Sequence, residues 1–361
     1  MSIILFIIIL AVLILVHEIG HFLVAKKFGI RVDEFGIGYP PRAIGKKIGE
    51  TIYSLNFIPF GGFVKIFGEN ADDASNPSDA GRNFSQKPRY VQALVLVAGV
   101  AFNAIFAWLL ISVGFMVGLP TPASYSSAVS GSKLVITSVM KGSPAELAGV
   151  RIGDVVTSAT TSELALPTVQ TESFQNFIAG AKNNPVGLTL SRGEEKIYTE
   201  ITPKEGVVED RAAIGVSLEM IGTLRLNPLM ALWEGGKNTL VLIEQTTIGL
   251  GKFLYQSVTG RANFSEVSGP VGIVGMVGDI SVLGFIYLLS FTATISINLA
   301  VINLIPFPAL DGGRLLFVLI EKIKGSPIKP VVANAFNSIG FFLLLLLMAV
   351  VTYHDIAKLV G

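Results

Sequence analysis

Four stretches of the chain are predominantly apolar. Each is long enough to span a membrane or forms the centre of a predicted span. The first covers residues 3–25, ends at Lys26 and Lys27, and exceeds the roughly 20 residues that a helix needs to cross a bilayer's hydrocarbon. The pattern predicts a polytopic α-helical membrane protein with about four transmembrane helices. The other three spans are expected at 91–119, at 280–305 and around a centre at 341–351.

A shorter, alternating pattern follows the first span. Residues 51–58 and 63–67 alternate between apolar and polar side chains, and Pro59-Phe60-Gly61-Gly62 between them is typical of a turn. We therefore expect a membrane-associated β-hairpin in this loop. An apolar hairpin beside a membrane helix either dips into the bilayer or lies on its surface, and the pattern leaves both possibilities open.

Residues 123–222 are polar and rich in strand patterns, which indicates one inserted domain between two spans. Within it, the run from Ser143-Pro144-Ala145 through Ala148-Gly149 to Gly153-Asp154 closely resembles the signature of a PDZ domain. That resemblance implies an α+β fold that binds extended chains along a sheet edge. The alternative is a spacer or gate without a peptide ligand. The expected elements are strands at 134–139, 186–191 and 196–202 and a helix at 174–181.

The segment 224–262 combines apolar runs with charges such as Lys237 and Glu244, which predicts an amphipathic helix lying on the membrane surface. A Gly-rich connector at 268–275 then leads into the third span. The sequence thus divides into four parts: 1–122 with the first two transmembrane helices and a cytoplasmic hairpin loop, 123–222 with an extracytoplasmic PDZ domain, 223–275 with the surface helix and connector, and 276–361 with the last two transmembrane helices.

Composition narrows the possible chemistry. Of the 361 residues, 51% are hydrophobic and 15% are charged, and the net charge of +1 gives no reason to expect a nucleic-acid partner. The absence of cysteine excludes a Cys-based zinc site, a thiol nucleophile and disulfide bonds. Only three histidines are present, so each one bears on any metal site: His17, His21 and His354.

Two of these histidines belong to the motif His17-Glu18-x-x-His21, in the last third of the first span. Residues four apart lie on one helix face, so both rings are within reach of one metal ion, with Glu18 placed to act as a base. In a soluble helix the same motif often marks only an exposed polar face. Ionisable side chains at membrane depth are energetically unfavourable, however, which favours a functional site here. Two histidines still lack a third protein ligand.

Asp311 is the candidate for that third ligand. It follows Pro306 and Pro308, which interrupt the helix after the third span, although an aspartate there is also a suitable helix N-cap. Basic residues are enriched at 26–90 and 315–330, which places both loops in the cytoplasm and brings Asp311 to the side of the membrane where the histidines lie. His354 falls at the opposite face. The expected site is one Zn²⁺ on His17, His21 and Asp311, with Glu18 as the general base in peptide-bond hydrolysis.

These motifs resemble the site-2 protease family, in particular its bacterial, RseP-type branch of intramembrane zinc metalloproteases. The resemblance rests on His-Glu-x-x-His, on Asn303-x-x-Pro306-x-Pro308-x-Leu310-Asp311-Gly312, on one PDZ-like domain and on four spans. It implies Zn²⁺ ligation by the two histidines and the aspartate, and catalysis by the glutamate. Tandem PDZ domains are known in this branch; the sequence here predicts a single one.

The resemblance also implies a substrate and a place in the cell. It implies cleavage of transmembrane segments of pre-trimmed membrane proteins, such as anti-sigma factors or signal-peptide remnants, in a bacterial inner membrane. The active site would lie near the cytoplasmic side. The hairpin would offer a strand to the substrate. The residues implied in substrate binding are Asn298, Asn303, Pro306, Pro308, Gly61 and Gly62.

Two other functions remain alternatives at this point. One is a membrane-anchored PDZ scaffold with a vestigial metal site, and the complete set of His17, His21, Asp311 and Glu18 speaks against it. The other is a transporter, suggested by the broken helix after the third span, although the sequence lacks a recognisable inverted repeat. Transmembrane proteins and the lipid bilayer are the expected partners, with a peptide or protein at the PDZ domain as a further possibility.

Overall fold

The computed structural model describes residues 2–69, 81–162, 164–167, 169–208, 211–261 and 268–360. Residues 70–80, after the predicted hairpin, and the end of the predicted surface segment at residue 262 lie outside these residues. The chain divides into two compact units. The first comprises Met1–Ser112, Leu232–Ser281 and Leu288–Gly361, and the second comprises Val113–Ala231 and Val282–Tyr287.

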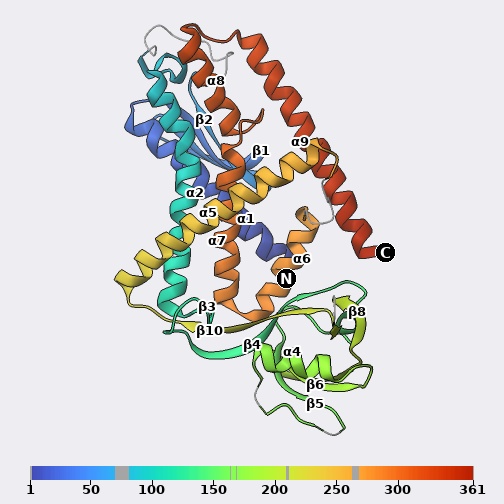
Figure 1. Cartoon of the computed structure of the whole chain (residues 1–361). Helices are drawn as coiled ribbons and strands as arrows, with labels where there is room; N and C mark the ends of the chain where they lie inside the picture. The colour runs from blue at the N-terminus through green and yellow to red at the C-terminus, as the bar shows by residue number, and fades with distance from the viewer. Residues whose placement is uncertain are drawn as a thin grey trace. The chain divides into compact units, whose positions relative to one another are not determined.

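Long apolar helices dominate the first unit (Figure 1). Within the described residues, four helices are long and apolar enough to cross a membrane, and these define a multi-pass membrane protein. They are α1 (Ser2–Lys27), α2 (Arg89–Val117), α7 (Phe285–Leu304) and the segment Val331–Ala357 of α9 (Pro330–Val360).

The third span differs from its prediction. The sequence predicted one helix over 280–305, whereas the structure has α6 (Pro270–Leu283) and α7 separated at Gly284. Gly284 has φ +112°, a left-handed conformation that breaks a right-handed helix and that glycine adopts without strain. The Gly-rich connector is therefore the first part of α6, and the candidate span begins at Phe285.

Helix α5 (Pro228–Val258) occupies the region where an amphipathic surface helix was predicted. Its Gly235 lies against Ser112 of α2, and Thr246 donates a hydrogen bond to Asn298 Oδ1 of α7 at 3.3 Å. Helix α5 therefore crosses α2 and α7 obliquely (Figure 1).

The predicted hairpin is larger than expected. Strand β1 (Val32–Ile48) and strand β2 (Thr51–Ile66) meet at a turn at Gly49, which has φ +64°. The register runs antiparallel from Ile48↔Thr51 to Arg42↔Asn56, and again from Val32↔Ile66 to Ile37↔Gly62. Residues 34–37 of β1 also face residues 52–55 of β2, from Glu34↔Ile52 to Ile37↔Leu55. The long hairpin is therefore folded back on itself, and β2 reverses direction between residues 55 and 62, a stretch that contains most of the predicted turn.

A buried cluster fixes the base of this hairpin against the helices. It includes Ala25 of α1, Val32 of β1, Val95 of α2 and Val318 of α8 (Asp311–Lys324). These residues lie far apart in sequence, and their burial holds the start of β1 and the end of β2 beside the last turns of α1. The hairpin thereby lies along the helix that carries the two histidines.

The second unit is a β-sheet with two short helices. The strand order is β3-β10-β4-β5-β6-β7, and the sheet core includes Leu134, Ile136, Phe174 and Leu190. The predicted strands at 134–139, 186–191 and 196–202 and the helix near 174–181 all have counterparts. The elements are β3 (Leu119–Pro122), β4 (Ser130–Val139), α3 (Pro144–Leu147), β5 (Val155–Thr160), α4 (Thr171–Gly180), β6 (Val186–Arg192), β7 (Glu195–Ile201) and β10 (Val216–Leu224).

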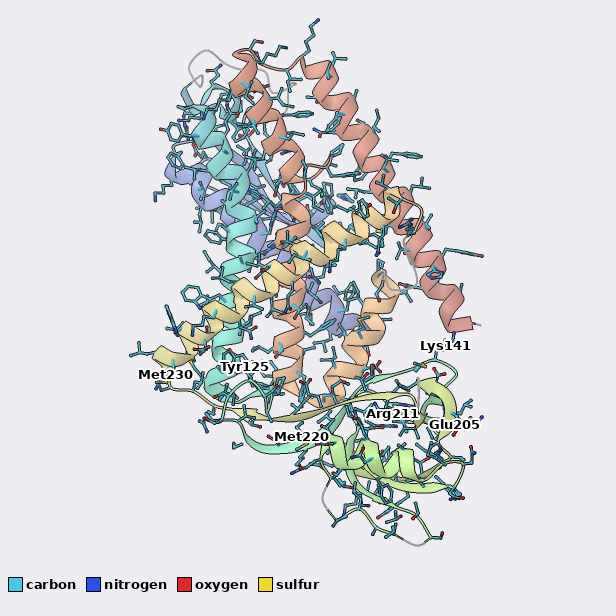
Figure 2. The ribbon with its side chains drawn as sticks, viewed as in Figure 1. Tyr125, Lys141, Glu205, Arg211, Met220 and Met230 are labelled. Atoms are coloured by element: carbon cyan, nitrogen blue, oxygen red, sulfur yellow. The ribbon has the colours of Figure 1, made fainter. Side chains whose placement is uncertain are left out.

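Two features of this unit were missed by the sequence analysis. Strands β8 (Lys204–Val208) and β9 (Arg211–Ala213) form a separate ribbon that carries Glu205 and Arg211 (Figure 2). Buried Asp154 accepts two hydrogen bonds from the Arg192 guanidinium, each at 2.8 Å, and this contact raises the pKa of Arg192. The pair ties the Gly153-Asp154 turn to β6.

Candidate metal centre

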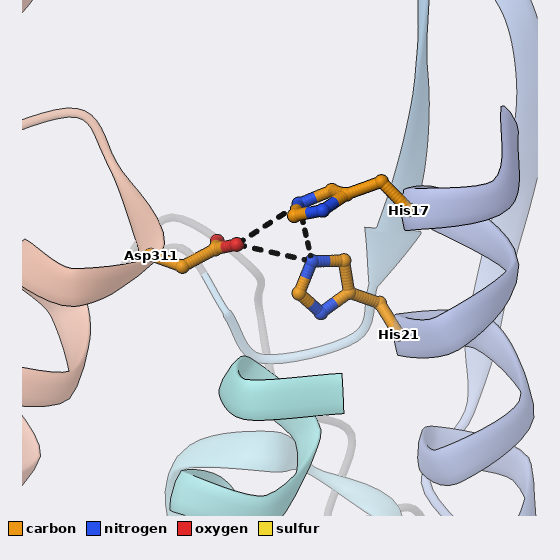
Figure 3. Close-up of side chains that lie close together, drawn as sticks. All are labelled: His17, His21 and Asp311. Carbon is orange, nitrogen blue, oxygen red and sulfur yellow. Dashed lines mark hydrogen bonds and ion pairs between the residues drawn. The ribbon is translucent and has the colours of Figure 1, made fainter. Parts of the chain in front are cut away.

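Three side chains from opposite ends of the chain converge in the first unit (Figure 3). His17 Nε2 lies 3.0 Å from Asp311 Oδ2, and His21 Nε2 lies 3.3 Å from the same oxygen. The two Nε2 atoms are 3.1 Å apart. Both histidines are buried, and the described residues contain no second group of three or more potential ligands this close. The three side chains predicted to bind zinc are therefore neighbours in space.

The backbone around Asp311 explains how it reaches α1. Helix α7 ends at Leu304, and the chain turns through Ala309, which has φ +69°, before α8 begins at Asp311. Gly312 and Gly313 then pack so closely that a Cβ atom at either position would lie 2.2 Å from a backbone oxygen of the preceding turn. This tight turn requires glycine and directs the Asp311 carboxylate away from its own helix toward the histidines.

The donor set fits Zn²⁺. Zinc accepts two imidazole nitrogens and one carboxylate oxygen at about 2.0–2.1 Å in tetrahedral geometry, so neighbouring ligand atoms should lie about 3.3 Å apart. The observed separations of 3.0, 3.1 and 3.3 Å are close to one triangular face of that tetrahedron. Two imidazole nitrogens at 3.1 Å also repel each other unless a proton or a cation lies between them.

The protonation pattern of the cluster suits ligation. Burial alone would raise the pKa of the Asp311 carboxyl, but the two imidazoles hold it well below its usual value, so the carboxylate form is favoured. His21 Nδ1 lies 2.8 Å from the carbonyl oxygen of Val95. A proton on Nδ1 satisfies this carbonyl and leaves the Nε2 lone pair directed into the cluster.

Glu18 lies between two pockets that meet at the cluster. A pocket of about 410 Å³ is lined by the cluster, Glu18, Tyr39 and Arg314, and an adjoining one of about 390 Å³ is also lined by His17, Asp311 and Glu18. The Cγ atom of Glu18 is 3.6 Å from an ideal Cβ position at Gly62, so β2 runs directly past this carboxylate. The structure thus brings the predicted base and the predicted hairpin together.

The six predicted substrate-binding residues fall into two groups. Gly61, Gly62 and Asn303 line the pocket of about 390 Å³ together with Glu18. Asn298 instead contacts α5 through Thr246, and Pro306 is exposed. Pro308 packs against Gly340 of α9, where a Cβ atom would lie 2.0 Å from the proline ring.

Several residues at the site were not among the predicted ones. Tyr39 of β1 and Arg314 of α8 line the pocket of about 410 Å³, and Gly99 of α2 lies against both imidazole rings. Asn103, one turn further along α2 and buried, lies beside His17. The spacing of four between Gly99 and Asn103 was the signal available, since it puts both on one face of α2.

The fold and the site together define a class: a multi-pass membrane protein with a buried cluster of two histidines and one carboxylate, of the kind that holds a catalytic metal, beside a glutamate. Comparison with known proteins identifies the family. Residues 5–347 match the family model described as Peptidase family M50. The chain belongs to peptidase family M50, the site-2 protease type of zinc-dependent hydrolase.

Relatives cover nearly the whole length. A protein from Clostridium perfringens, provisionally named a zinc metalloprotease, is 37% identical over 95% of both chains. One from Nostoc, named in the same way, is 33% identical over 96% of this chain and 93% of its own. The zinc metalloprotease RasP of Shouchella clausii is 29% identical over 98% of both. The match therefore includes the spans, the hairpin and the sheet unit.

Proposed function

We propose that this intramembrane zinc metalloprotease binds Zn²⁺ through His17, His21 and Asp311 and uses Glu18 as its general base. The observation that carries the proposal is the convergence of the three ligand atoms, with one ligand 294 residues from the first, beside a glutamate that faces two pockets. A vestigial metal site on a scaffold protein would not need this complete and closely spaced set.

The chain's own groups divide the chemistry between them. Zinc, when bound, supplies Lewis-acid activation of water and of the scissile carbonyl. Glu18 removes the proton from the attacking water and later delivers it to the leaving amine. The Val95 carbonyl keeps His21 in the tautomer that directs Nε2 toward the ion. Burial by α2 and the hairpin limits the access of bulk water to this step.

The substrate we propose is a transmembrane segment of a membrane protein that another protease has already trimmed, such as an anti-sigma factor or a signal-peptide remnant. A helical segment must unwind before its peptide bonds are reachable, and its freed backbone groups then need partners inside the membrane. Strand β2 runs past Glu18 at Gly61 and Gly62, which supports pairing of the unwound substrate with this hairpin.

For the second unit we propose a single PDZ domain on the extracytoplasmic side of a bacterial inner membrane. Its sheet, the helix α4 and the Ser143-capped turn at α3 support a PDZ-like fold. The basic loops at 26–90 and 315–330 support a cytoplasmic position for the hairpin and for the entrance to the active site. A peptide or protein bound at a sheet edge is the ligand that this fold would take.

The test compares purified wild-type protein with Glu18→Gln on a trimmed single-span membrane protein. We expect cleavage to fall by about 100-fold or more, because the general base is lost, while zinc content and folding stay unchanged. Glu244→Gln on exposed α5 is the matched control and should cleave like wild type. Wild-type cleavage by Glu18→Gln would reject the proposed role of Glu18. His17→Ala should abolish zinc binding.

A further inference from the structure

The two imidazoles of the cluster differ in the hydrogen-bond partner of their second ring nitrogen, Nδ1. His21 Nδ1 has a backbone carbonyl as its partner, that of Val95. His17 Nδ1 has a side chain instead: the amide of Asn103, whose Nδ2 atom is 3.4 Å away. If His17 Nε2 is to ligate a metal, Nδ1 must carry the proton and needs an acceptor.

The side-chain oxygen of Asn103, Oδ1, can serve as this acceptor. Its side chain is fully buried at 0% exposure, and its Oδ1 atom has no hydrogen-bond partner among the residues that the structure describes. A buried carbonyl without a donor costs about 1–3 kcal/mol. Turning the planar amide by 180° exchanges Oδ1 and Nδ2, and it sets the unpaired oxygen against His17 Nδ1.

The backbone of α2 is held so that this contact is possible. Ser296 Oγ of α7 donates a hydrogen bond of 2.8 Å to the backbone oxygen of Asn103. One turn earlier, Gly99 lies so close to both rings that an ideal Cβ there would be 2.4–2.7 Å from their atoms. Helix α2 is thus fixed against α1 at this level, and the amide of Asn103 has a defined position relative to His17.

We propose that Asn103 is a positioning residue for the zinc site: its side-chain oxygen accepts the Nδ1 proton of His17 and so fixes the tautomer and orientation of that ring. Asn103 does for His17 what the Val95 carbonyl does for His21. The inference rests on the proposed role of His17 as a zinc ligand. Outer partners of this kind change metal affinity by about 10–100-fold.

The experiment measures zinc affinity in the catalytically inactive Glu18→Gln protein by competition with a chelator of known affinity. Asn103→Leu keeps the branched skeleton of four side-chain heavy atoms but has no acceptor, and we expect it to weaken zinc binding by about 10–100-fold. Asn103→Asp retains an acceptor and should bind zinc like the parent. Ser112→Ala is the control: it removes a side-chain hydrogen bond of the same helix, to the carbonyl oxygen of Trp108, at a position nine residues from Asn103, and zinc affinity should not change.

A second measurement separates positioning from a packing role. The thermal unfolding midpoint of the metal-free Asn103→Leu protein should equal that of its parent, whereas a purely structural role would lower it. Because the chain has only three histidines, ¹⁵N-histidine labelling of the zinc-loaded parent resolves each ring. A slowly exchanging proton on His17 Nδ1 is expected, and this result stands even if a variant fails to fold.

Two outcomes would overturn the inference: parental zinc affinity in Asn103→Leu, or a His17 Nδ1 without a protected proton. The result for His17→Ala separates the proposed ligand set from the proposed role of Asn103. If His17→Ala loses zinc but Asn103→Leu does not, only the role of Asn103 fails. If His17→Ala keeps zinc, the proposed ligand set fails with it.

Discussion

At residue 99 the site depends on the absence of a side chain. Gly99 of α2 faces His17 and His21, and an ideal Cβ atom would lie 2.4 Å from His21 Nε2 and 2.6 Å from His17 Cε1. These rings belong to the two proposed histidine ligands and lie in a buried space, so a methyl group there must displace either the rings or α2. Glycine at this position therefore sets how closely the second span approaches the first.

We accordingly expect Gly99→Ala to weaken zinc binding by about tenfold or more, since overpacking of this kind typically costs 1–3 kcal/mol. Zinc content after dialysis against a chelator is the measurement. Gly249→Ala in α5 is the matched control, because nothing lies within 4 Å of a Cβ there and alanine favours a helix. If Gly99→Ala retains zinc as tightly as wild type, the rings are less constrained than their contacts indicate.

At the scale of elements, the hairpin presents its folded-back strand to Glu18. Gly61 has φ +90°, and an ideal Cβ would lie 2.6 Å from Tyr39 Cε2, so this position both bends β2 and packs against β1. The bend brings the following Gly62 next to Glu18. The strand that we propose for substrate pairing therefore has its shape fixed at one glycine.

Gly61→Ala should slow cleavage several-fold while zinc content stays at the wild-type level, because backbone strain of about 1–3 kcal/mol and the Tyr39 contact displace β2 from the site. The readouts are the cleavage rate and the bound zinc. Gly49→Ala introduces an L residue at a similar positive φ but in open space, and it should cleave nearly as wild type. Equal rates for both variants would argue against a substrate role for this bend.

Sequence patterns predicted those elements whose cause is local. The run of apolar residues is sufficient to identify α1, and the spacing of His17 and His21 fixes their common face. Loop charge and the count of spans then suggested that Asp311 returns to the same level. In contrast, the double pairing of β1, the break at Gly284 and the oblique course of α5 depend on contacts between distant segments, which no local pattern specifies.

The same limit applies within the site. His17 and Asp311 belong to recognisable motifs. Asn103, Gly99 and Tyr39 come next to the site only when α2 and the hairpin pack on α1. Pro306 and Pro308 belong to the same motif as Asp311, and Asn298 lies five residues before that motif, yet these three do not line the pocket beside Glu18 in the way that Asn303 does. Proximity in sequence was a poor guide to these residues because α7 ends at Leu304, between the two asparagines and the two prolines.

At the scale of the whole molecule, the four candidate spans and the two basic loops make the orientation in the membrane testable. The chain contains no cysteine, so a single introduced cysteine can be labelled without background. Lys196 of β7 and Lys324 at the end of α8 are both exposed. The proposed topology places them on opposite sides of the bilayer.

A membrane-impermeant maleimide should therefore label Lys196→Cys in cells whose cytoplasmic membrane is intact and accessible from outside, and it should label Lys324→Cys only after that membrane is opened. Wild-type protein should stay unlabelled under both conditions. Labelling of Lys324→Cys before opening, or protection of Lys196→Cys, would contradict the proposed orientation of the spans.

The separation of 294 residues between His17 and Asp311 has a consequence for biosynthesis. The two histidines are translated long before Asp311, so the proposed ligand set cannot assemble until residue 311 has been translated and inserted. A nascent chain that ends before residue 311 thus holds two of the three proposed ligands, and we expect no hydrolysis from it. Late synthesis of the proposed third ligand would keep the protease inactive during its own synthesis.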